Sequence, residues 1–423
     1  MPVAPPVVPP RVAVLADDLT SAGDGAAPFR RAGLPARVLL SGGPLAGHGR
    51  EDGVLAVDLG SRLLDEAGAA RRTREAARAL SGAGLLLKTV DSTLRGHVAA
   101  ELHAAREGSG RRAVVIAPAF PAEGRTTLEG VQYVRGVRVD ESEFARDPAH
   151  PVRTADLARL LPDAVPVAPG RTGLLPELLA RGGLFACSAA TDADLDRIVA
   201  AVPDHRAVLW VGSPGLAAAL ARHHALPGSA GPAGELPLAR RPLTVVGSAN
   251  PATRRQLALL AAEPGAVCAD TAGAADPADT ADPADTADPA DTAARLLAAD
   301  APVRILHTPH ERRPGPAGST RLLAASVAEL AGRAPFDGLV LTGGETAEAV
   351  LRALGAHGID LHDEPEPGVA RGTLTGPAGV PRVPVVVKAG GFGDERALLR
   401  LHALLTGHPA RARGGRGGGH ASR

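Results

Sequence analysis

Short apolar runs alternate with Ala-, Leu- and Arg-rich helical patterns along most of this 423-residue chain, and this alternation constrains the fold more than any other feature. The runs are nearly continuous in apolar residues, which is typical of strands that are covered on both faces. Strands of this kind, separated by helices, predict an α/β fold with mostly parallel sheets. The predicted strands are residues 11–16, 37–40, 54–58, 85–90, 113–118, 184–188, 207–212, 243–247, 303–307, 338–341 and 384–388.

A Pro- and Gly-rich stretch at residues 226–241, LPGSAGPAGELPLARR, separates two regions of this pattern. The stretch has little helical or strand periodicity, so we interpret it as a linker. It predicts an N-terminal domain at residues 11–225 and a C-terminal domain at residues 242–408. We expect each domain to be a mostly parallel sheet flanked by helices.

A low-complexity insert interrupts the second domain. The sequence ADPADT occurs three times in tandem at residues 275–292, and proline at every sixth residue forbids a regular helix. We therefore expect a surface loop there, between a strand near Val267 and a helix near Ala293. The termini, residues 1–10 and 409–423, are predicted to be disordered because little in them can be buried.

Charge and composition narrow the kind of partner. The 46 basic residues balance 46 acidic ones, which argues against nucleic acid or an anionic membrane but leaves an anionic small molecule open. The chain has neither a signal-peptide pattern nor a run of about 18 apolar residues, so we expect a cytoplasmic location. Cys187 and Cys268 lack metal or redox spacing, and we expect two small buried residues.

Lysine is almost absent from the chain. Of the 46 basic residues only Lys88 and Lys388 are lysines, and all others are arginines. A lysine is a compact point charge on a flexible stem, whereas an arginine is a planar fork. Each of the two follows an apolar, strand-like run and opens a stretch rich in Gly, Ser or Thr. We interpret both as functional positions at which arginine would not serve.

Polar residues follow the first predicted strand at the point where it ends. Asp17 and Asp18 stand there, and ligands of open α/β sheets bind at the carboxyl ends of strands. Carboxylates at this edge can accept hydrogen bonds from the hydroxyls of a substrate. Helix capping explains one of these polar residues but not the whole cluster.

A second polar segment, KTVDSTLRG, starts with Lys88 at the end of another strand. Lys88 or Arg95 could hold a substrate carboxylate, and Asp91 could act as a base or orient a hydroxyl. An ordinary Asp–Arg ion pair with Ser92 as a helix cap is the alternative, but it gives no reason for Lys88. A third segment places Arg125 in Gly-Arg-Thr-Thr, where a binding role and plain surface exposure are equally good explanations.

The second domain contains three junctions at which a predicted strand passes through small residues into a loop or helix. They are Gly247-Ser248-Ala249-Asn250, Gly343-Gly344-Glu345-Thr346 and Lys388-Ala389-Gly390-Gly391. Small residues at the start of a helix leave backbone N–H groups free to bind phosphate. Three such junctions in one domain indicate a polyphosphate site, although none of them matches the P-loop pattern.

Taken together and in this order, these segments resemble the four-carbon acid sugar kinase family, which includes the threonate, erythronate and 3-oxo-tetronate kinases. The resemblance covers about residues 11–405 and rests on ADDLTSAGD, KTVDSTLRGH, APAFPAEGRTT, FARDP, TGGETA and KAGGFGD. It implies that the N-terminal domain binds the sugar acid and the C-terminal domain binds ATP, with the active site in the cleft between them. The implied reaction transfers the γ-phosphoryl group to the terminal hydroxyl, with Mg²⁺ neutralising the developing charge.

The resemblance also implies roles for individual residues. The implied catalytic residues are Asp91, Asp18 and Lys88, and the choice of base between the two aspartates is open. The implied substrate-binding residues are Asp17, Asp18, Arg62, Lys88, Asp91, Ser92, Arg95 and Arg125. The implied nucleotide-binding residues are Ser248, Asn250, Gly343, Gly344, Glu345, Thr346, Lys388, Gly390 and Gly391. Metal ligands are not assigned, and a homodimer is a further hypothesis.

The chain departs from the family pattern at three places. Ser21 stands where glycine is usual, and Asp58-Leu59-Gly60-Ser61-Arg62 replaces the usual D-T-x-S-R. Both changes bear on the identity of the substrate. Asn250 replaces a serine and bears on a nucleotide contact. The alternatives to a four-carbon sugar-acid kinase are a kinase for another small hydroxy acid and a nucleotide-binding sensor without turnover.

Overall fold

The computed structural model describes residues 9–43, 45, 48, 51–147, 150–224, 235–271, 288–297, 301–309, 316–333 and 336–408. Most of the two termini, of the linker and of the ADPADT insert lies outside the described residues, so the predictions made for them stay predictions. All eleven predicted strands are present, with ends that differ by no more than one residue.

The strands are β1 (Val12–Ala16), β2 (Ala36–Leu39), β3 (Val54–Asp58), β4 (Leu85–Thr89), β5 (Ala113–Ala117), β6 (Arg125–Leu128), β7 (Val131–Val134), β8 (Val137–Arg138), β9 (Ala164–Val167), β10 (Gly183–Cys187), β11 (Val208–Gly212), β12 (Pro242–Val246), β13 (Ala266–Asp270), β14 (Val303–His307), β15 (Gly338–Thr342), β16 (Gly358–Glu366), β17 (Val369–Thr375) and β18 (Pro384–Lys388). The α-helices are α1 (Leu19–Arg31), α2 (Glu66–Ala79), α3 (Val98–Ser109), α4 (Leu157–Leu160), α5 (Leu175–Arg181), α6 (Asp192–Ala200), α7 (Pro214–His224), α8 (Pro251–Ala261), α9 (Pro289–Leu297), α10 (Pro316–Arg333), α11 (Gly344–Ala353) and α12 (Ala397–Thr406). Short 3₁₀ turns are η1 (Pro121–Glu123), η2 (Val139–Glu141), η3 (Glu143–Arg146) and η4 (Pro169–Leu174).

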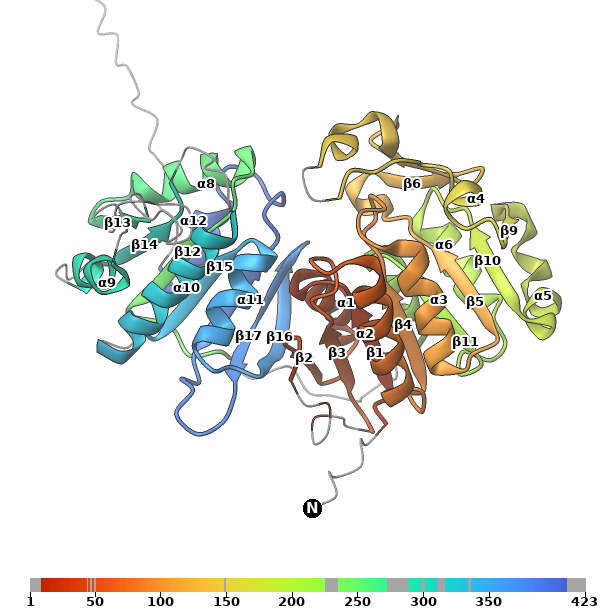
Figure 1. The fold of residues 1–423 in the computed structure, drawn as a ribbon, viewed down its shortest axis with the longest axis horizontal. Coiled ribbons are helices and arrows are strands. Elements are labelled where there is room, and N and C mark those ends of the chain that lie inside the picture. Colours follow the sequence, from red (N-terminus) through yellow and green to blue (C-terminus); the bar gives the residue numbers. More distant parts are fainter. Residues whose placement is uncertain are drawn as a thin grey trace, which may run out of the picture.

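Fifteen strands form one continuous sheet in the order β13-β14-β12-β15-β18-β17-β16-β2-β3-β1-β4-β11-β5-β10-β9. The run from β2 to β9 is parallel throughout, and so is the run from β13 to β18. The predicted α/β class with mostly parallel sheets is therefore confirmed. Figure 1 shows two lobes, each built on one parallel run, that meet where β16 lies beside β2.

The antiparallel pair β16–β17 joins the two parallel runs, and the sequence did not predict it. The segment GIDLHDEPE of β16 mixes charged residues and proline with apolar ones and is buried only in part. Gly358 permits the junction because a Cβ there would lie 2.1 Å from the carbonyl oxygen of Val38 on β2. Gly23 on α1 allows a similar approach, since its Cβ would lie 2.8 Å from Ala370 Cβ on β17. Elements of the two lobes are thus packed against each other.

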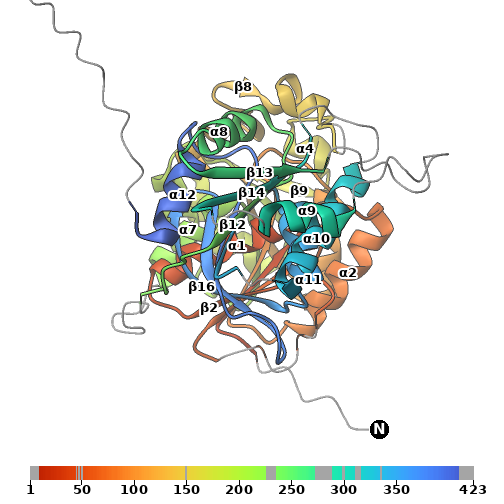
Figure 2. The same ribbon diagram turned by 90° about the vertical axis from the view of Figure 1, so that its left-hand side faces the viewer.

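Helices cover both faces of the sheet. In the N-terminal lobe α1, α6 and α7 pack on one face, through residues such as Leu19 and Leu216, while α2 and α3 pack on the other. In the C-terminal lobe α10 and α11 pack on one face and α8 and α12 on the other. Figure 2 shows α10 and α11 on one side of the strands and α12 on the opposite side. This double coverage explains the continuous apolar runs of the sequence.

Two smaller predictions need correction. Cys187 is buried as expected, but Cys268 on β13 is exposed. The last repeat of the insert was expected to be loop, yet Pro289 begins α9. A proline in the first helical position is compatible with a helix because the N–H it lacks would have no partner within the helix.

Three histidines lie where β11 begins and α7 ends. The His205 ring stacks on Trp210 with centroids 5.4 Å apart and meets the His224 ring edge-on at 4.3 Å. Burial, together with the neighbouring histidines, lowers the pKa of His205 and of His224 to about 4. An unfolded histidine titrates near its ordinary pKa of about 6.5, so the unfolded chain binds more protons between these two values.

The free energy of unfolding should therefore fall as the pH drops from about 6.5 toward 4 and should not respond to these groups above that window. Calorimetry at pH 7 and pH 5 is expected to show a loss of about 2 °C or more in Tm. His205→Phe keeps the stacking on Trp210 but cannot titrate, so its loss should be smaller. An equal loss in this variant would contradict the assignment.

Candidate active site

The carboxyl ends of β1 and β3 carry the first group of charged side chains. Asp17 and Asp18 follow β1, and Arg62 lies in the loop after β3. Arg62 Nε donates to Asp17 Oδ2 at 2.8 Å, and Arg62 Nη1 donates to Asp18 Oδ2. Asp18 Oδ1 also accepts from the backbone N–H of Ser21 at 2.7 Å and so caps α1. Asp18 therefore serves as a helix cap and a member of the site at once.

Asp17 is held in its charged form. Burial alone would raise the pKa of its carboxyl, but the positive charges of Arg62 and Lys88 outweigh burial, and the pKa lies below its ordinary value. Asp17 Oδ1 is buried and has no hydrogen-bond partner within the described part of the chain. Asp58 at the end of β3 behaves in the opposite way, because burial and the charge of Glu348 raise its pKa well above the ordinary value.

The end of β4 carries the second group. Asp91 Oδ2 accepts hydrogen bonds from Arg95 Nε and from Thr93 Oγ1, both at 2.5 Å. Arg95 Nη1 also donates to Asp147 Oδ2 at 3.3 Å. Burial would raise the pKa of Asp91, but Arg95 and Arg62 hold it far below its ordinary value. A carboxylate with such a low pKa accepts a proton poorly at neutral pH.

Arg125 comes from β6, a strand of the small antiparallel sheet β6-β7-β8, which the sequence did not predict. Its Nη1 atom donates to Ser92 Oγ at 2.6 Å. Among the described residues it forms no ion pair, and its buried Nε atom has no hydrogen-bond partner. Burial lowers the pKa of its guanidinium group. Arg125 thus differs from Arg62 and Arg95, which are both paired with carboxylates.

The side chains of Arg62, Asp91, Arg95 and Arg125 line a hollow of about 70 Å³, and residues from both lobes contribute to its walls. Its N-terminal-lobe residues are Thr20, Ser21, Asp24, Arg62, Thr89, Val90, Asp91, Ser92, Arg95, Phe120, Arg125 and Pro214. Ala389 and Phe392 come from the loop after β18 in the C-terminal lobe. Five predicted substrate-binding residues are therefore brought together around one hollow, while Asp17, Asp18 and Lys88 lie outside its lining. Asp17 and Asp18 are joined to it through Arg62.

Both lysines are fully buried, with no exposed surface. Lys88 Nζ contacts Glu101 Oε2 at 2.9 Å and donates to the carbonyl oxygen of Thr89 at 2.6 Å. Lys388 Nζ donates to the carbonyl of Ala389 at 2.9 Å, and burial lowers its pKa to about 8. In both lysines the ammonium group donates a hydrogen bond to the backbone carbonyl of the next residue. A compact ammonium group can make this contact more easily than a planar guanidinium group. Direct contact of either lysine with a ligand stays a prediction.

The loops after β12 and β18 meet at the edge of the C-terminal run. Asn250 Oδ1 caps α8 by accepting from Ala252 N at 2.9 Å, and Ser248 Oγ accepts from Asn250 N at 3.2 Å. The other loop lies against them: a Cβ on Gly390 would be 2.5 Å from Ser248 Oγ, and one on Gly391 would be 3.4 Å from Asn250 Nδ2. Four of the predicted nucleotide-binding residues are thus neighbours.

The third junction, at the start of α11, lies beside Asp18 and Thr20 of the N-terminal lobe. Gly343 has a φ of 97°, which favours glycine, and no described side chain caps this helix. A Cβ on Gly344 would lie 3.6 Å from Asp18 Oδ2, so the start of α11 is close to the Asp18 carboxylate. Burial, opposed by Arg62 and reinforced by Asp18, raises the pKa of Glu345. Uncapped backbone N–H groups at a helix start can bind an anion, and here they lie next to the Asp18 carboxylate.

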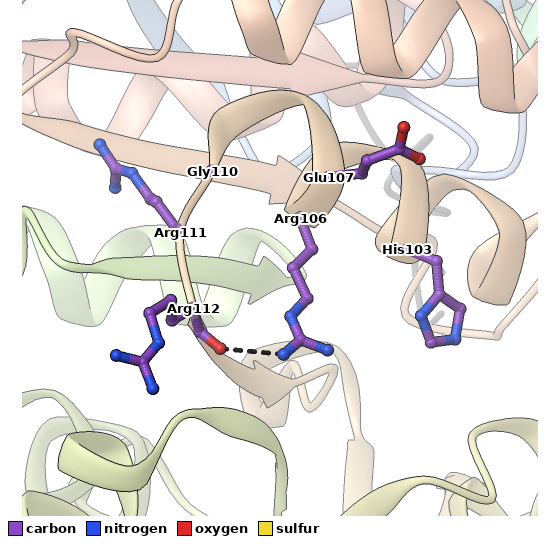
Figure 3. Close-up of a pocket in the computed structure, with 6 residues that line it drawn as sticks. All are labelled: His103, Arg106, Glu107, Gly110, Arg111 and Arg112. Atoms are coloured by element: carbon purple, nitrogen blue, oxygen red, sulfur yellow. Dashed lines mark hydrogen bonds between the residues drawn. The ribbon is translucent and has the colours of Figure 1, made fainter.

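A larger hollow of about 380 Å³ lies at the other end of the strands, where α3 leads into β5 (Figure 3). Arg111 there is buried and donates to the carbonyls of Val208 at 2.6 Å and Ala83 at 2.7 Å. Arg106 donates to the carbonyl of Arg112 at 3.2 Å, and the labelled guanidinium groups point in different directions. Ligands of such sheets bind at the carboxyl ends of strands. We therefore place the site at the smaller hollow.

Sequence reasoning overlooked several residues at the hollow. Asp24 lines it, and burial, with Glu364 and Asp18, raises the pKa of its carboxyl well above the ordinary value. Phe392 also lines it. Ser21, which the sequence marked as a departure from the family pattern, accepts a hydrogen bond from Arg62 Nη2 at 3.3 Å. Asp24 and Phe392 belong to ADDLTSAGD and KAGGFGD, so their place in these motifs was a signal that could have been used.

Among the described residues, no group of three His, Cys, Asp or Glu side chains is arranged to hold a metal ion. No helix in the described ranges is long and apolar enough to span a membrane.

Two family models match the chain. Residues 12–220 match one described as a sugar-binding N-terminal domain, and residues 243–398 match one described as a nucleotide-binding C-terminal domain. The fold and the shared hollow therefore define a two-domain α/β protein of the sugar- and nucleotide-binding class.

Curated relatives narrow the class. The D-threonate kinase of Bordetella bronchiseptica is 39% identical over 92% of this chain and 96% of its own length, and that of Cupriavidus necator is 36% identical over 93% and 97%. A solved structure from Salmonella typhimurium LT2 superposes with a TM-score of 0.75 at 23% identity, over 92% of this chain and 98% of the other, which shows the same fold. The chain belongs to the four-carbon acid sugar kinase family, as the sequence motifs predicted.

Proposed function

We propose that this protein transfers the γ-phosphoryl group of ATP to the terminal hydroxyl of D-threonate. The observation that carries the proposal is a hollow that holds three arginines and is lined by both lobes. Two curated relatives at 36–39% identity are named D-threonate kinases, which supports this sugar acid ahead of erythronate and 3-oxo-tetronates. A cytoplasmic location and a homodimer stay predictions.

Arg125 is our candidate for holding the substrate carboxylate. Arg62 is already paired with Asp17 and Asp18, and Arg95 with Asp91. Arg125 forms no ion pair with a described residue and keeps a buried, unbonded Nε atom. An arginine fork binds a carboxylate through parallel hydrogen bonds, and a partly buried fork gains more from doing so.

The hydroxyl to be phosphorylated would then be directed toward Asp18 and the start of α11. Gly344 lies beside Asp18, and uncapped N–H groups at this helix start suit a phosphate. Because the pKa of Asp91 is so low, we favour Asp18 as the group that orients the hydroxyl. Phosphoryl transfer depends mainly on positioning and electrostatics, so a strong base is not required.

Asp18 and Glu345 are our candidates for holding a magnesium ion that arrives with ATP. Burial raises the pKa of Glu345 and the charge of Asp18 raises it further, so a cation would relieve the repulsion between the two carboxylates. Magnesium commonly binds through one or two carboxylates and the phosphates of a nucleotide. When bound, it would neutralise charge on the transferred phosphoryl group.

An ADP-release assay with ATP and Mg²⁺ tests the proposal on D- and L-threonate, D- and L-erythronate and 3-oxo-tetronates. We expect the highest kcat/KM on D-threonate. Higher turnover on another sugar acid would replace D-threonate as the proposed substrate, and the protein would still be a sugar-acid kinase. ATP binding without turnover on any of them would favour another hydroxy acid or a sensor.

A glycine variant tests the nucleotide side. A Cβ on Gly247 would lie 1.8 Å from Thr346 Oγ1 and 2.8 Å from Thr346 Cβ, so Gly247→Ala must displace the start of α11. Because small misplacements in a phosphate site are costly, we expect the Kd for ATP, measured by calorimetry, to rise about 10- to 100-fold. Gly332→Ala in α10 is the control, since nothing lies within 4 Å of its added Cβ. Equal weakening in both variants would refute the assignment.

A further inference from the structure

Two phenylalanines lie on two of the arginines at the hollow, in a chain that has only six. The Arg95 guanidinium carbon lies 5.2 Å from the centre of the Phe144 ring, and that of Arg125 lies 5.5 Å from the centre of the Phe392 ring. Phe144 belongs to η3 in the same lobe as Arg95. Phe392 comes from the opposite lobe, so of these two contacts it is the one on Arg125 that joins the two lobes.

The loop that carries Phe392 is held by α8, the helix that the predicted nucleotide-binding residue Asn250 caps. Gln256 on α8 donates through Nε2 to the carbonyls of Phe392 at 3.0 Å, Gly393 at 3.2 Å and Asp394 at 2.9 Å. Thr253 on the same helix donates through Oγ1 to the carbonyl of Gly390. The first two turns of α8 therefore fix the position of the Phe392 loop.

The Phe392 ring has close neighbours in both lobes. A Cβ on Gly368, at the β16–β17 turn, would lie 2.6 Å from Phe392 Cδ1, so the turn leaves room for the ring only because this residue is glycine. The same ring also meets Arg125. A ring held between a turn of one lobe and an arginine of the other transmits a shift of its loop to that arginine.

We propose that Phe392 couples the binding of the two substrates. This residue comes from the nucleotide-binding lobe and lies behind Arg125. The affinity of the sugar-acid pocket would thereby depend on whether a nucleotide is bound. The inference deepens the proposed function and rests on it. An aromatic face attracts a cation more strongly where water is excluded, and it steers the edge of the guanidinium group toward an anionic ligand. Coupling between two binding sites is reciprocal, so the sugar acid should tighten nucleotide binding by the same factor.

Calorimetry of D-threonate binding, with and without ADP and Mg²⁺, measures the coupling. In the unaltered protein we expect ADP to lower the D-threonate Kd at least about 5-fold, a common size for coupled sites. Phe392→Ala should bring this ratio near one and raise the KM for D-threonate about 10-fold, while the Kd for ADP measured without sugar acid changes little. Phe392→Leu fills the space beside Gly368 without an aromatic face and should behave in the same way, which excludes a folding defect as the cause.

Phe144→Ala is the matched control. It removes the aromatic partner of Arg95 without touching the nucleotide lobe, so the KM for D-threonate should rise while the effect of ADP is kept. An unchanged ADP effect in both Phe392 variants would overturn the inference. So would loss of the ADP effect in Phe144→Ala as well.

A readout without sugar acid separates this inference from the proposed function. Phenylglyoxal modifies accessible arginines, and peptide mass spectrometry reports the rate at Arg125. We expect ADP with Mg²⁺ to slow this rate in the unaltered protein and to have no effect in Phe392→Leu. If D-threonate does not bind at all, the proposed substrate fails, and the labelling rates still decide the inference. Equal ADP protection in the variant would refute it.

Discussion

Asp91→Asn is expected to lower kcat/KM for the sugar acid by about 10²-fold or more, within the range of positioning effects. The Asp91 carboxylate accepts hydrogen bonds from Arg95 Nε and Thr93 Oγ1 just after the end of β4. An amide oxygen could accept these hydrogen bonds but would not supply the negative charge that pairs with Arg95. Because the pKa of Asp91 is far below its ordinary value, the carboxylate stays charged at every pH at which the enzyme would be assayed. Steady-state kinetics with ATP and Mg²⁺ measure the loss.

Asp147→Asn provides the comparison for this prediction. Asp147 is the second carboxylate on Arg95, at a longer distance of 3.3 Å, and 22% of its side chain is exposed against 9% for Asp91. A partly exposed ion pair contributes about 1 kcal/mol or less, so we expect a loss of no more than about 5-fold. A near-normal rate in Asp91→Asn would remove Asp91 from the catalytic residues. If the two variants lost activity equally, Asp91 would matter only as a partner of Arg95.

Lys88→Met is expected to reduce the free energy of unfolding by about 3–5 kcal/mol, the usual cost of breaking a buried ion pair from one side. Lys88 has no exposed surface, and Glu101, which it meets at 2.9 Å, would keep a buried charge without its cation. Ser61 Oγ donates to the same carboxylate but cannot neutralise it. Denaturant unfolding monitored by the buried Trp210 would measure the loss.

The double variant Lys88→Met/Glu101→Leu separates stability from activity. Replacing both members of a buried pair by apolar residues is often neutral, so stability should largely return. The positive charge of Lys88 lowers the pKa of Asp17, so its loss moves that pKa upward. We expect a folded protein with reduced kcat. Full activity would show that Lys88 acts only in folding, and no recovery of stability would show that the ion pair is not the origin of the loss.

The sequence predicted the parallel strands well and the junction of the lobes not at all. Strands covered on both faces read as continuous apolar runs, whereas β16 alternates Asp, His and Glu with apolar residues and is only partly buried. Its partner β2 lies more than 300 residues earlier in the chain, at the pairing of Ile359 with Val38. No local pattern predicts a pairing over that distance.

The site was predicted in the same uneven way. Asp17, Asp91 and the glycine-rich loops could be predicted as site residues because each follows a predicted strand. The carboxyl ends of parallel strands lie at the same edge of a sheet, where ligands bind. The direction of a side chain at a strand end was not readable, and Lys88 extends away from the hollow toward Glu101. The aromatic partner of Arg125 was also not readable, since Phe392 belongs to the other lobe.

The sequence by itself determined the fold class, the order of the elements, the family and the motifs that supply the charged side chains, since these follow from local periodicity and from motif order. Only the tertiary structure decided which charges neutralise each other, and which of the three arginines at the hollow forms no ion pair with a described carboxylate. It also decided that a ring from the nucleotide lobe covers that arginine. The reason is physical: pKa, burial and ion pairing depend on distances between segments far apart in the chain, and these distances are set by the packing of α1 against β16 and β17.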